Sequence, residues 1–204
     1  MIAIKNFLDN KDLEQVVNIQ ESPEEFFDDG GVHDSKITST QQWMSPNDIL
    51  YQIINDKLKQ VKQFAGHTID GLQVLTAMKP YDVHSDYIVQ KNQVPLSDPT
   101  VHQPTYTVII PISEGYSTVV FNQSGNYNNF LEYKRKHPIP KSCCSDEQWE
   151  KYCSHCHKED QQYLTIKEVF EWTKGTLFAF DRSLFHCSSN FKNKKQAIVL
   201  WLSK

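Results

Sequence analysis

The stretch that decides the fold of this chain lies near its C-terminus and reads TLFAFDRSLFHCSSNFKNKKQAIVLWL (residues 176–202). It contains three short runs rich in aromatic and aliphatic residues, at 176–180, 185–188 and 196–202, separated by polar turn residues. Short apolar runs bounded by turn signals predict three consecutive β-strands.

Upstream segments extend this pattern toward the N-terminus. Further strands are predicted at 72–78, 81–89, 105–112 and 116–121, with residues 1–8 as a possible edge strand. Helices are predicted from Asp9 or Asn10 to about residue 20, from Ser45-Pro46 to about Gly66, and from Thr165 to Thr173. Residues 21–42 and 90–103 are polar and are expected to be loops, and residues 122–163 are expected to be an insertion between strands.

Helices followed by several short strands predict a mainly β fold with supporting N-terminal helices, an antiparallel double-sheet barrel of the jelly-roll type. A chain of 204 residues suits one domain. We therefore expect a single domain over residues 1–204. In it, residues 1–70 form a helical support and residues 71–204 form the jelly-roll core, with the insertion at about 122–163.

The composition is that of an ordinary soluble globular protein, with 39% hydrophobic and 23% charged residues. A formal net charge of −4 provides no overall basic field, so a nucleic-acid partner is not expected. No apolar run approaches the ~20 residues that span a bilayer, so no membrane partner is expected either. The N-terminus lacks the charged and apolar regions of a secretory signal, which predicts a cytoplasmic protein.

A candidate metal site begins at Val83-His84-Ser85-Asp86. On a strand, side chains at i and i+2 point to one face, so His84 and Asp86 could reach one ion, whereas a helix would separate them by about 200°. His186 supplies a second imidazole in apolar surroundings. Two histidines and one carboxylate form the facial triad of non-haem Fe(II) oxygenases, which leaves coordination positions for a co-substrate and O₂. His-X-Asp also occurs by chance, and a lone histidine in an apolar strand is usually a core residue.

The surrounding residues support the metal site. The stretches EWTKGTLFAFDRSLFH (171–186) and KQAIVLW (195–201) resemble the Fe(II)- and 2-oxoglutarate-dependent oxygenase family, in particular its prolyl-hydroxylase-like branch. The resemblance covers about residues 72–121 and 164–203. The chain is also similar to the small oxygenases of tailed phages of marine bacteria, which carry a similar Cys/His insertion; this implies a bacterial or phage-infected host cell.

The resemblance implies a cupin-like double-stranded β-helix with specific site residues. His84, Asp86 and His186 would bind Fe(II), and Lys195 would bind the C5 carboxylate of 2-oxoglutarate. Many relatives have arginine at that position, but lysine keeps the charge. Lys194 would point to the opposite face of a regular strand. Because position 197 is alanine, where many relatives carry a hydroxyl, a second polar contact to 2-oxoglutarate is expected from Thr107 or Tyr106.

The insertion contains a cluster of cysteine and histidine residues. Cys153 and Cys156 have the spacing of half a tetrahedral zinc site. The other half could come from Cys143 and Cys144 or from His157, although neither spacing is standard. The alternative is a set of unligated cysteines on a loop. Cys187 is expected to be a small apolar filler that faces away from the iron. The insertion is also predicted to border the mouth of the active site and to shape substrate choice.

The sequence thus predicts a dioxygenase that uses Fe(II), 2-oxoglutarate and O₂ and releases succinate and CO₂, with zinc as a candidate metal in the insertion. The substrate is expected to be a small molecule or a peptide. The favoured site of oxidation is a prolyl side chain or another amino-acid or peptide side chain. Two alternatives stay open. One is a cupin-like metalloprotein that does not use 2-oxoglutarate, and the other is a zinc-stabilised interaction or nucleic-acid adaptor. The sequence does not indicate the oligomeric state.

Overall fold

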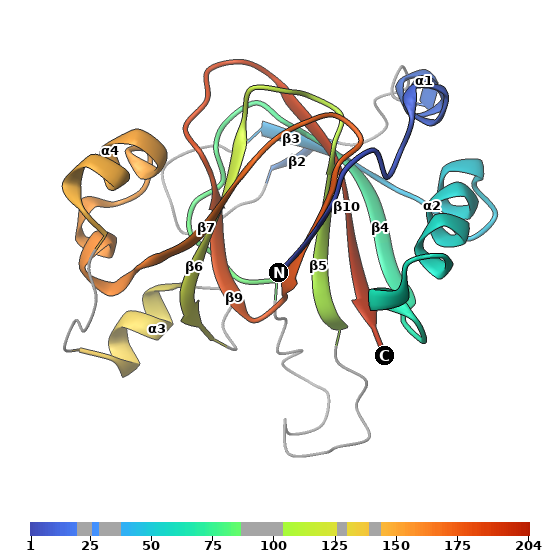
Figure 1. Cartoon of the computed structure of the whole chain (residues 1–204). Helices are drawn as coiled ribbons and strands as arrows, with labels where there is room; N and C mark the ends of the chain where they lie inside the picture. The colour runs from blue at the N-terminus through green and yellow to red at the C-terminus, as the bar shows by residue number, and fades with distance from the viewer. Residues whose placement is uncertain (20–25, 29–37, 87–103, 126–129, 139–143) are drawn as a thin grey trace.

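A computed structural model describes residues 1–19, 26–28, 38–86, 104–125, 130–138 and 144–204. Two antiparallel sheets dominate this part of the chain (Figure 1). The larger sheet has seven strands in the order β1 (Ile2–Ile4), β8 (Leu177–Asp181), β5 (Pro104–Pro111), β10 (Lys195–Ser203), β4 (Thr68–Ala77), β3 (Thr38–Trp43) and β2 (Phe26–Asp28). The smaller sheet has the order β7 (Ile166–Glu171), β6 (Ser117–Ser124) and β9 (Leu184–Ser188).

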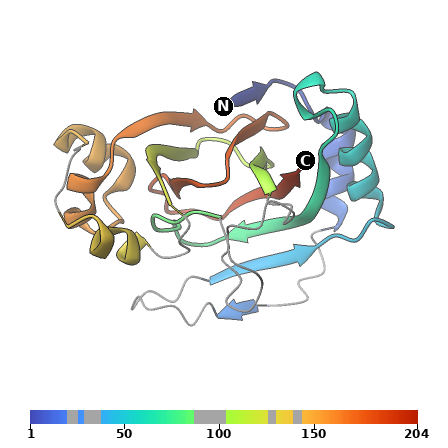
Figure 2. The ribbon, with the colours of Figure 1, turned by 90° about the horizontal axis from the view of Figure 1, so that it is seen from below.

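The two sheets face each other across an interior that lies between them (Figure 2). One apolar cluster contains residues of both sheets, among them Ile109 and Val199 from the larger sheet and Val120 and Leu184 from the smaller one. This arrangement is a double-stranded β-helix, and it confirms the predicted fold class.

Strand β10 shows why the C-terminal run is apolar along its whole length. It lies between β4 and β5, so both of its edges are paired, and both of its faces are covered by other side chains. Ile198 and Leu200 pack into the cluster shared with the N-terminal helices, whereas Ala197 and Val199 face the interior between the sheets. A strand buried on both faces reads as a continuous hydrophobic segment.

The N-terminal helices α1 (Asn10–Ile19) and α2 (Ile49–Lys59) cover the outer face of the larger sheet (Figure 1). α2 buries Leu50, Ile54 and Leu58, which are spaced by four residues and therefore share one side of the helix. The short helix η1 (Lys62–Phe64) follows and buries Phe64. These elements cover one face of the sheet, and the same region of the chain also contributes strands β1, β2 and β3.

The insertion lies on the opposite side of the barrel from α1 and α2 (Figures 1 and 2). Its described elements are α3 (Phe130–Lys136), α4 (Asp146–Cys153) and η2 (Lys158–Tyr163). A capping box starts α4, because Ser145 Oγ accepts the Gln148 N–H and the Gln148 side chain accepts the Ser145 N–H. Trp149 is fully buried in a cluster with Phe121 and Phe185 on the outer face of the smaller sheet.

Three expected elements need correction. Residues 165–173 were predicted to be a helix, but β7 occupies Ile166–Glu171 and pairs with β6. The predicted 21–42 loop contains β3 and β2, although much of it lies outside the described residues. The predicted strand 81–89 is reduced to a single bridge between His84 and His186, and its residues 87–89 lie outside the described part. For residues 165–173, pairing with β6, which is distant in sequence, decides the structure over local preference.

The second predicted helix is shorter than expected at both ends. Ser45 to Asp48 forms a turn in which the Asp48 N–H donates to Ser45 O at 3.0 Å, so the helix begins only at Ile49. It ends at Lys59, and Gly66 closes the turn after η1 with a φ of 79°. That left-handed conformation favours glycine, which explains the stop signal that the sequence carries at this position.

Candidate metal centre

Two adjacent backbone segments position the candidate ligands. His84 lies on the segment that follows β4, and His186 lies in the middle of β9. The His84 N–H donates to His186 O at 3.0 Å, and the His186 N–H donates to His84 O at 2.8 Å. This pair of backbone hydrogen bonds brings together two residues that are 102 positions apart, which fixes the separation of their imidazoles.

His84, Asp86 and His186 converge on one point. One ligand atom from each lies within 4.8 Å of the other two. His186 Nε2 is 3.6 Å from Asp86 Oδ2, His84 Nε2 is 3.9 Å from Asp86 Oδ1, and the two ring centroids are 4.3 Å apart. Donors at such separations can surround a single ion bound at about 2.0–2.2 Å.

Backbone carbonyls hold both imidazoles in orientation. His84 Nδ1 lies 2.7 Å from Asp82 O, and His186 Nδ1 lies 3.2 Å from Leu184 O. A proton on each Nδ1 satisfies these carbonyls and leaves each Nε2 lone pair directed at the shared point. Hydrogen bonding of the second ring nitrogen is the usual way in which proteins orient histidine ligands.

The carboxylate is held as firmly as the imidazoles. Thr107 Oγ1 on β5 donates to Asp86 Oδ2 at 2.6 Å, and Arg182 Nε donates to the backbone carbonyl of Asp86. Burial by itself would raise the pKa of Asp86, but the imidazoles of His186 and His84 and the Thr107 hydroxyl outweigh it and keep the pKa below its usual value. Asp86 is therefore an anion at neutral pH.

His186, unlike Asp86, is uncharged at neutral pH. Burial and the neighbouring His84 imidazole lower its pKa to about 4, so its ring is neutral at pH 7. Metal binding requires deprotonated ligands. An anionic carboxylate and a neutral imidazole nitrogen that point at the same position form a donor set that suits a divalent ion such as Fe(II).

A cavity of about 830 Å³ opens from this centre. His84, Asp86 and His186 all line it, and Lys195 lines it as well. Lys195 is only 4% exposed, whereas Lys194 is on the exposed face of the chain. This is the placement that strand alternation predicts for the two lysines.

The surroundings of Lys195 contain little negative charge. Its Nζ donates to Ser188 Oγ and lies 4.7 Å from the centroid of the Trp172 ring and 4.9 Å from that of Phe191. Among the described residues, no carboxylate forms an ion pair with it. Burial accordingly lowers the pKa of Lys195 to about 7.

The two predicted second contacts to 2-oxoglutarate lie on opposite faces of β5. Thr107 lines the cavity and donates to Asp86. Tyr106 packs among the residues beneath the N-terminal helices and makes edge contact with Phe64, with ring centroids 5.7 Å apart. The expectation for Tyr106 is therefore corrected, because alternation along β5 turns its side chain away from the cavity. The Thr107 hydroxyl proton is already used in the hydrogen bond to Asp86.

Other cavity residues could not be recognised from the sequence. Trp172, Ser188 and Arg182 line the cavity, and so do Trp43 and Trp201, which stack with ring centroids 5.7 Å apart. The insertion contributes Phe130, Leu131, Lys134, His157, Glu159 and Asp160. The insertion thus borders the cavity, as its position in the sequence suggested. Of these residues only Ser188 carried a usable signal, because it lies two positions after His186 on β9 and therefore shares its face.

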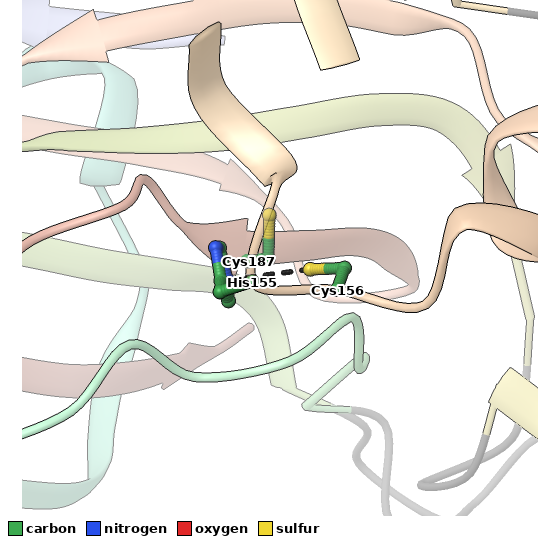
Figure 3. Close-up of side chains that lie close together, drawn as sticks. All are labelled: His155, Cys156 and Cys187. Atoms are coloured by element: carbon green, nitrogen blue, oxygen red, sulfur yellow. Dashed lines mark hydrogen bonds between the residues drawn. The ribbon is translucent and has the colours of Figure 1, made fainter. Parts of the chain in front are cut away.

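The predicted zinc set is not the set that the fold brings together. Cys143 lies outside the described residues, and Cys144 Sγ donates to Leu164 O at 3.1 Å. Instead, His155, Cys156 and Cys187 lie within 4.8 Å of one another (Figure 3). Hydrogen bonds with Cys187 and His155 outweigh burial and lower the pKa of Cys156 to about 7. Cys187, predicted to be a filler, faces away from the iron-type centre but belongs to this thiol cluster.

No family model matches this chain, and no curated protein does. Solved structures do match its fold. The 2-oxoglutarate complex of the viral collagen prolyl hydroxylase vCPH from Paramecium Bursaria Chlorella virus-1 is 14% identical, with a TM-score of 0.53 over 99% of this chain and 94% of that chain. A prolyl-4-hydroxylase of Pseudomonas putida is 10% identical, with a TM-score of 0.53 over 100% of this chain and 91% of that chain.

HygX from Streptomyces hygroscopicus, with nickel and 2-oxoglutarate bound, is 11% identical, with a TM-score of 0.53 over 99% of this chain and 82% of that chain. At these identities, the likeness establishes the architecture. The chain has the double-stranded β-helix fold of the Fe(II)/2-oxoglutarate oxygenases, and the resemblance inferred from its sequence is confirmed at the level of the fold. Among the described helices, none is both long enough and apolar enough to cross a membrane.

Proposed function

We propose that this protein is an Fe(II)- and 2-oxoglutarate-dependent oxygenase in which His84, Asp86 and His186 bind the iron. The observation that carries the proposal is the joint presence of this triad and a buried lysine in one cavity. When bound, Fe(II) with 2-oxoglutarate and O₂ supplies oxidative decarboxylation to succinate and CO₂, coupled to oxidation of a substrate C–H bond. The triad leaves coordination positions that both co-substrates need.

Lys195 separates this proposal from a cupin-like protein that does not use 2-oxoglutarate. Keeping an ammonium charged in a site that lowers its pKa from 10.5 to about 7 costs roughly 5 kcal/mol. An anionic ligand offsets that cost. The C5 carboxylate of 2-oxoglutarate would form a charge-assisted hydrogen bond with Lys195 Nζ, and the Ser188 hydroxyl at the same place could also donate to it.

Thr107 and Arg182 have a positioning role in this proposal. Both donate to Asp86, Thr107 to the side chain and Arg182 to the backbone. They keep one carboxylate oxygen occupied by a hydrogen bond and fix the turn that follows His84. The carboxylate is then held toward the imidazoles without having to reorganise when the ion binds.

We propose a prolyl or other amino-acid or peptide side chain as the substrate. A cavity of about 830 Å³ accommodates a side chain with some flanking backbone as well as the co-substrate. Trp43 is 55% exposed and stacks on Trp201, which provides an aromatic surface against which a pyrrolidine or aliphatic group could pack. Two of the structural neighbours are prolyl hydroxylases.

The test is succinate formation from 2-oxoglutarate by protein supplied with Fe(II) and O₂. Proline-containing peptides are compared with the same peptides carrying alanine in place of proline, and the peptide is checked for the gain of one oxygen atom. We expect Fe(II)-dependent succinate formation that a proline peptide stimulates and that His84→Ala abolishes. His137→Ala, which changes an exposed histidine outside the cavity, is the matched control. The absence of Fe(II)-dependent succinate formation would contradict the proposed activity, and stimulation by neither peptide set would contradict only the substrate class.

A further inference from the structure

A second group of metal-ligating side chains lies outside the iron-type centre, on the other face of β9. His155 and Cys156 follow α4 in the insertion, and Cys187 comes from β9 (Figure 3). Their ligand atoms all lie within 4.8 Å of one another. A fourth donor is adjacent, because Cys153 Sγ lies 3.9 Å from Cys187 Sγ. The cluster therefore contains three thiols and one imidazole.

The separations in this cluster suit a tetrahedral ion with sulfur and nitrogen ligands. Zinc binds sulfur at about 2.3 Å and nitrogen at about 2.0–2.1 Å, so neighbouring donors in a tetrahedron lie about 3.6–3.8 Å apart. The Cys153–Cys187 sulfur pair is at 3.9 Å, and His155 Nε2 lies 3.2 Å from Cys156 Sγ. Small adjustments of side chains would bring these pairs to the ideal values.

The local chain geometry also matches a zinc-binding turn. Cys153 and Cys156 are separated by two residues, and the Cys156 N–H donates to Cys153 O at 2.8 Å, which closes a turn between them. Cys-X-X-Cys turns of this kind supply half of many tetrahedral zinc sites. The other half comes from His155 within the turn and from Cys187 on the strand.

The burial of these side chains points the same way. Cys153 and Cys187 are 0% and 1% exposed, and Cys156 is 7% exposed. His155 Nε2 lies 3.2 Å from Tyr81 O, whereas the buried Nδ1 has no hydrogen-bond partner among the described residues. A closed set of buried thiols beside an imidazole suits a structural metal site.

We propose that Cys153, His155, Cys156 and Cys187 bind one structural Zn²⁺ ion. The ion would join the end of α4 to β9, at the position next to His186. It would thereby fix the insertion, whose residues line the cavity, to the strand that carries a ligand of the other centre. This inference does not depend on the proposed oxygenase activity.

The test is the metal content of the full chain, purified without an affinity tag and without added metal, measured by elemental mass spectrometry. We expect about one zinc per chain in the wild type, and loss of most of it in Cys156→Ser and in Cys187→Ser. Cys144→Ser, which changes a buried cysteine outside the cluster, should retain zinc. His84→Ala should retain zinc as well, because it affects only the iron-type centre.

A second measurement covers the case in which the cysteine variants do not fold. Wild-type protein stripped with a chelator is titrated with Co²⁺, and binding in the cluster should produce thiolate-to-cobalt charge-transfer absorption, which the oxygen and nitrogen donors of the triad cannot produce. A zinc-free wild type with no thiolate absorption on Co²⁺ addition would overturn the proposal. Zinc that persists in both serine variants, zinc that is lost in His84→Ala, or a Cys156–Cys187 disulfide in freshly purified protein would overturn it as well.

Discussion

His186 and Cys187 are neighbours on β9, yet they belong to two donor clusters of opposite character. His186 faces the cavity between the sheets with His84 and Asp86, whereas Cys187 faces the insertion with Cys153 and Cys156. The first cluster has nitrogen and oxygen donors and opens onto a cavity. The second has mostly sulfur donors and is closed.

Exposure quantifies this difference. The side chains of His84 and Asp86 are 33% and 16% exposed, whereas Cys153 and Cys187 are almost completely buried. An open site with hard donors suits an ion that must also bind substrates, and a closed site with thiolates suits an ion that only holds the fold. Strand alternation is enough to separate the two functions across the thickness of a single sheet.

The largest expected effect comes from removing one ligand of the open cluster. His84→Ala should lower 2-oxoglutarate turnover by roughly a thousandfold, or ~4 kcal/mol of lost transition-state stabilisation, because the ion loses one of its three protein ligands. Zinc content should not change. Steady-state succinate formation and elemental analysis of the same preparation measure both quantities. Simultaneous loss of iron and zinc would show that the two clusters are not independent.

The next effect concerns the buried cation of the open side. Lys195→Met keeps the length of the side chain but removes its charge, so the KM for 2-oxoglutarate should rise about ten- to hundredfold, the ~1.5–3 kcal/mol of a charge-assisted hydrogen bond. Lys194→Met, on the exposed face of the same segment, is the matched control and should change KM less than about twofold. The reverse result would mean that the side-chain register of β10 is wrong by one residue.

A smaller effect should follow from the group behind the carboxylate. Thr107→Val removes the hydroxyl that donates to Asp86 Oδ2. The pKa of Asp86 should rise, and affinity for Fe(II) should fall by about tenfold, since second-sphere partners commonly contribute 10–100-fold to metal affinity. Equilibrium competition with a chromogenic chelator measures this. Thr76→Val on β4, which lies outside the cavity, is the control. Equal losses of Fe(II) affinity in both variants would contradict the positioning role of Thr107.

The smallest effect is a pH dependence confined to the open side. Lys195 has a pKa of about 7 in the free protein, and a bound carboxylate favours its protonated form. The affinity for 2-oxoglutarate is therefore highest below pH 7, where Lys195 is protonated. It declines as the pH rises through this value, by about fivefold between pH 7 and pH 8. Binding isotherms across this range test the sign. Affinity that increases with pH would contradict the assignment of Lys195, and Lys195→Met should abolish the dependence.

Features fixed by local alternation could be predicted from the sequence. The strands that became β4, β5, β8, β9 and β10 were visible as short apolar runs, and alternation placed Lys195 inside and Lys194 outside. The spacing of His84 and Asp86 also restricted them to one face of an extended segment. These features depend on a few consecutive residues, so they need no knowledge of the partner strands.

Features decided by distant pairing could not be predicted. Thr165 and Gly175 look like the limits of a helix, yet residues Ile166–Glu171 between them form β7, which pairs with β6. Nothing in the sequence shows which face of β5 meets the cavity, so Thr107 and Tyr106 appeared equivalent. The cysteine cluster was missed for the same reason, since Cys187 is 31 positions away from Cys156 and approaches it only when the insertion packs on β9.

Anomalous diffraction measured across the iron and zinc absorption edges tests the two-cluster account most directly. The crystals would be of the full chain, grown anaerobically with Fe(II) and 2-oxoglutarate. We expect an iron peak about 2.0–2.2 Å from the ligand atoms of His84, Asp86 and His186, with a carboxylate of 2-oxoglutarate at Lys195. A separate zinc peak should lie among Cys153, His155, Cys156 and Cys187. An iron peak among the thiols, or no metal between the two imidazoles, would contradict the account.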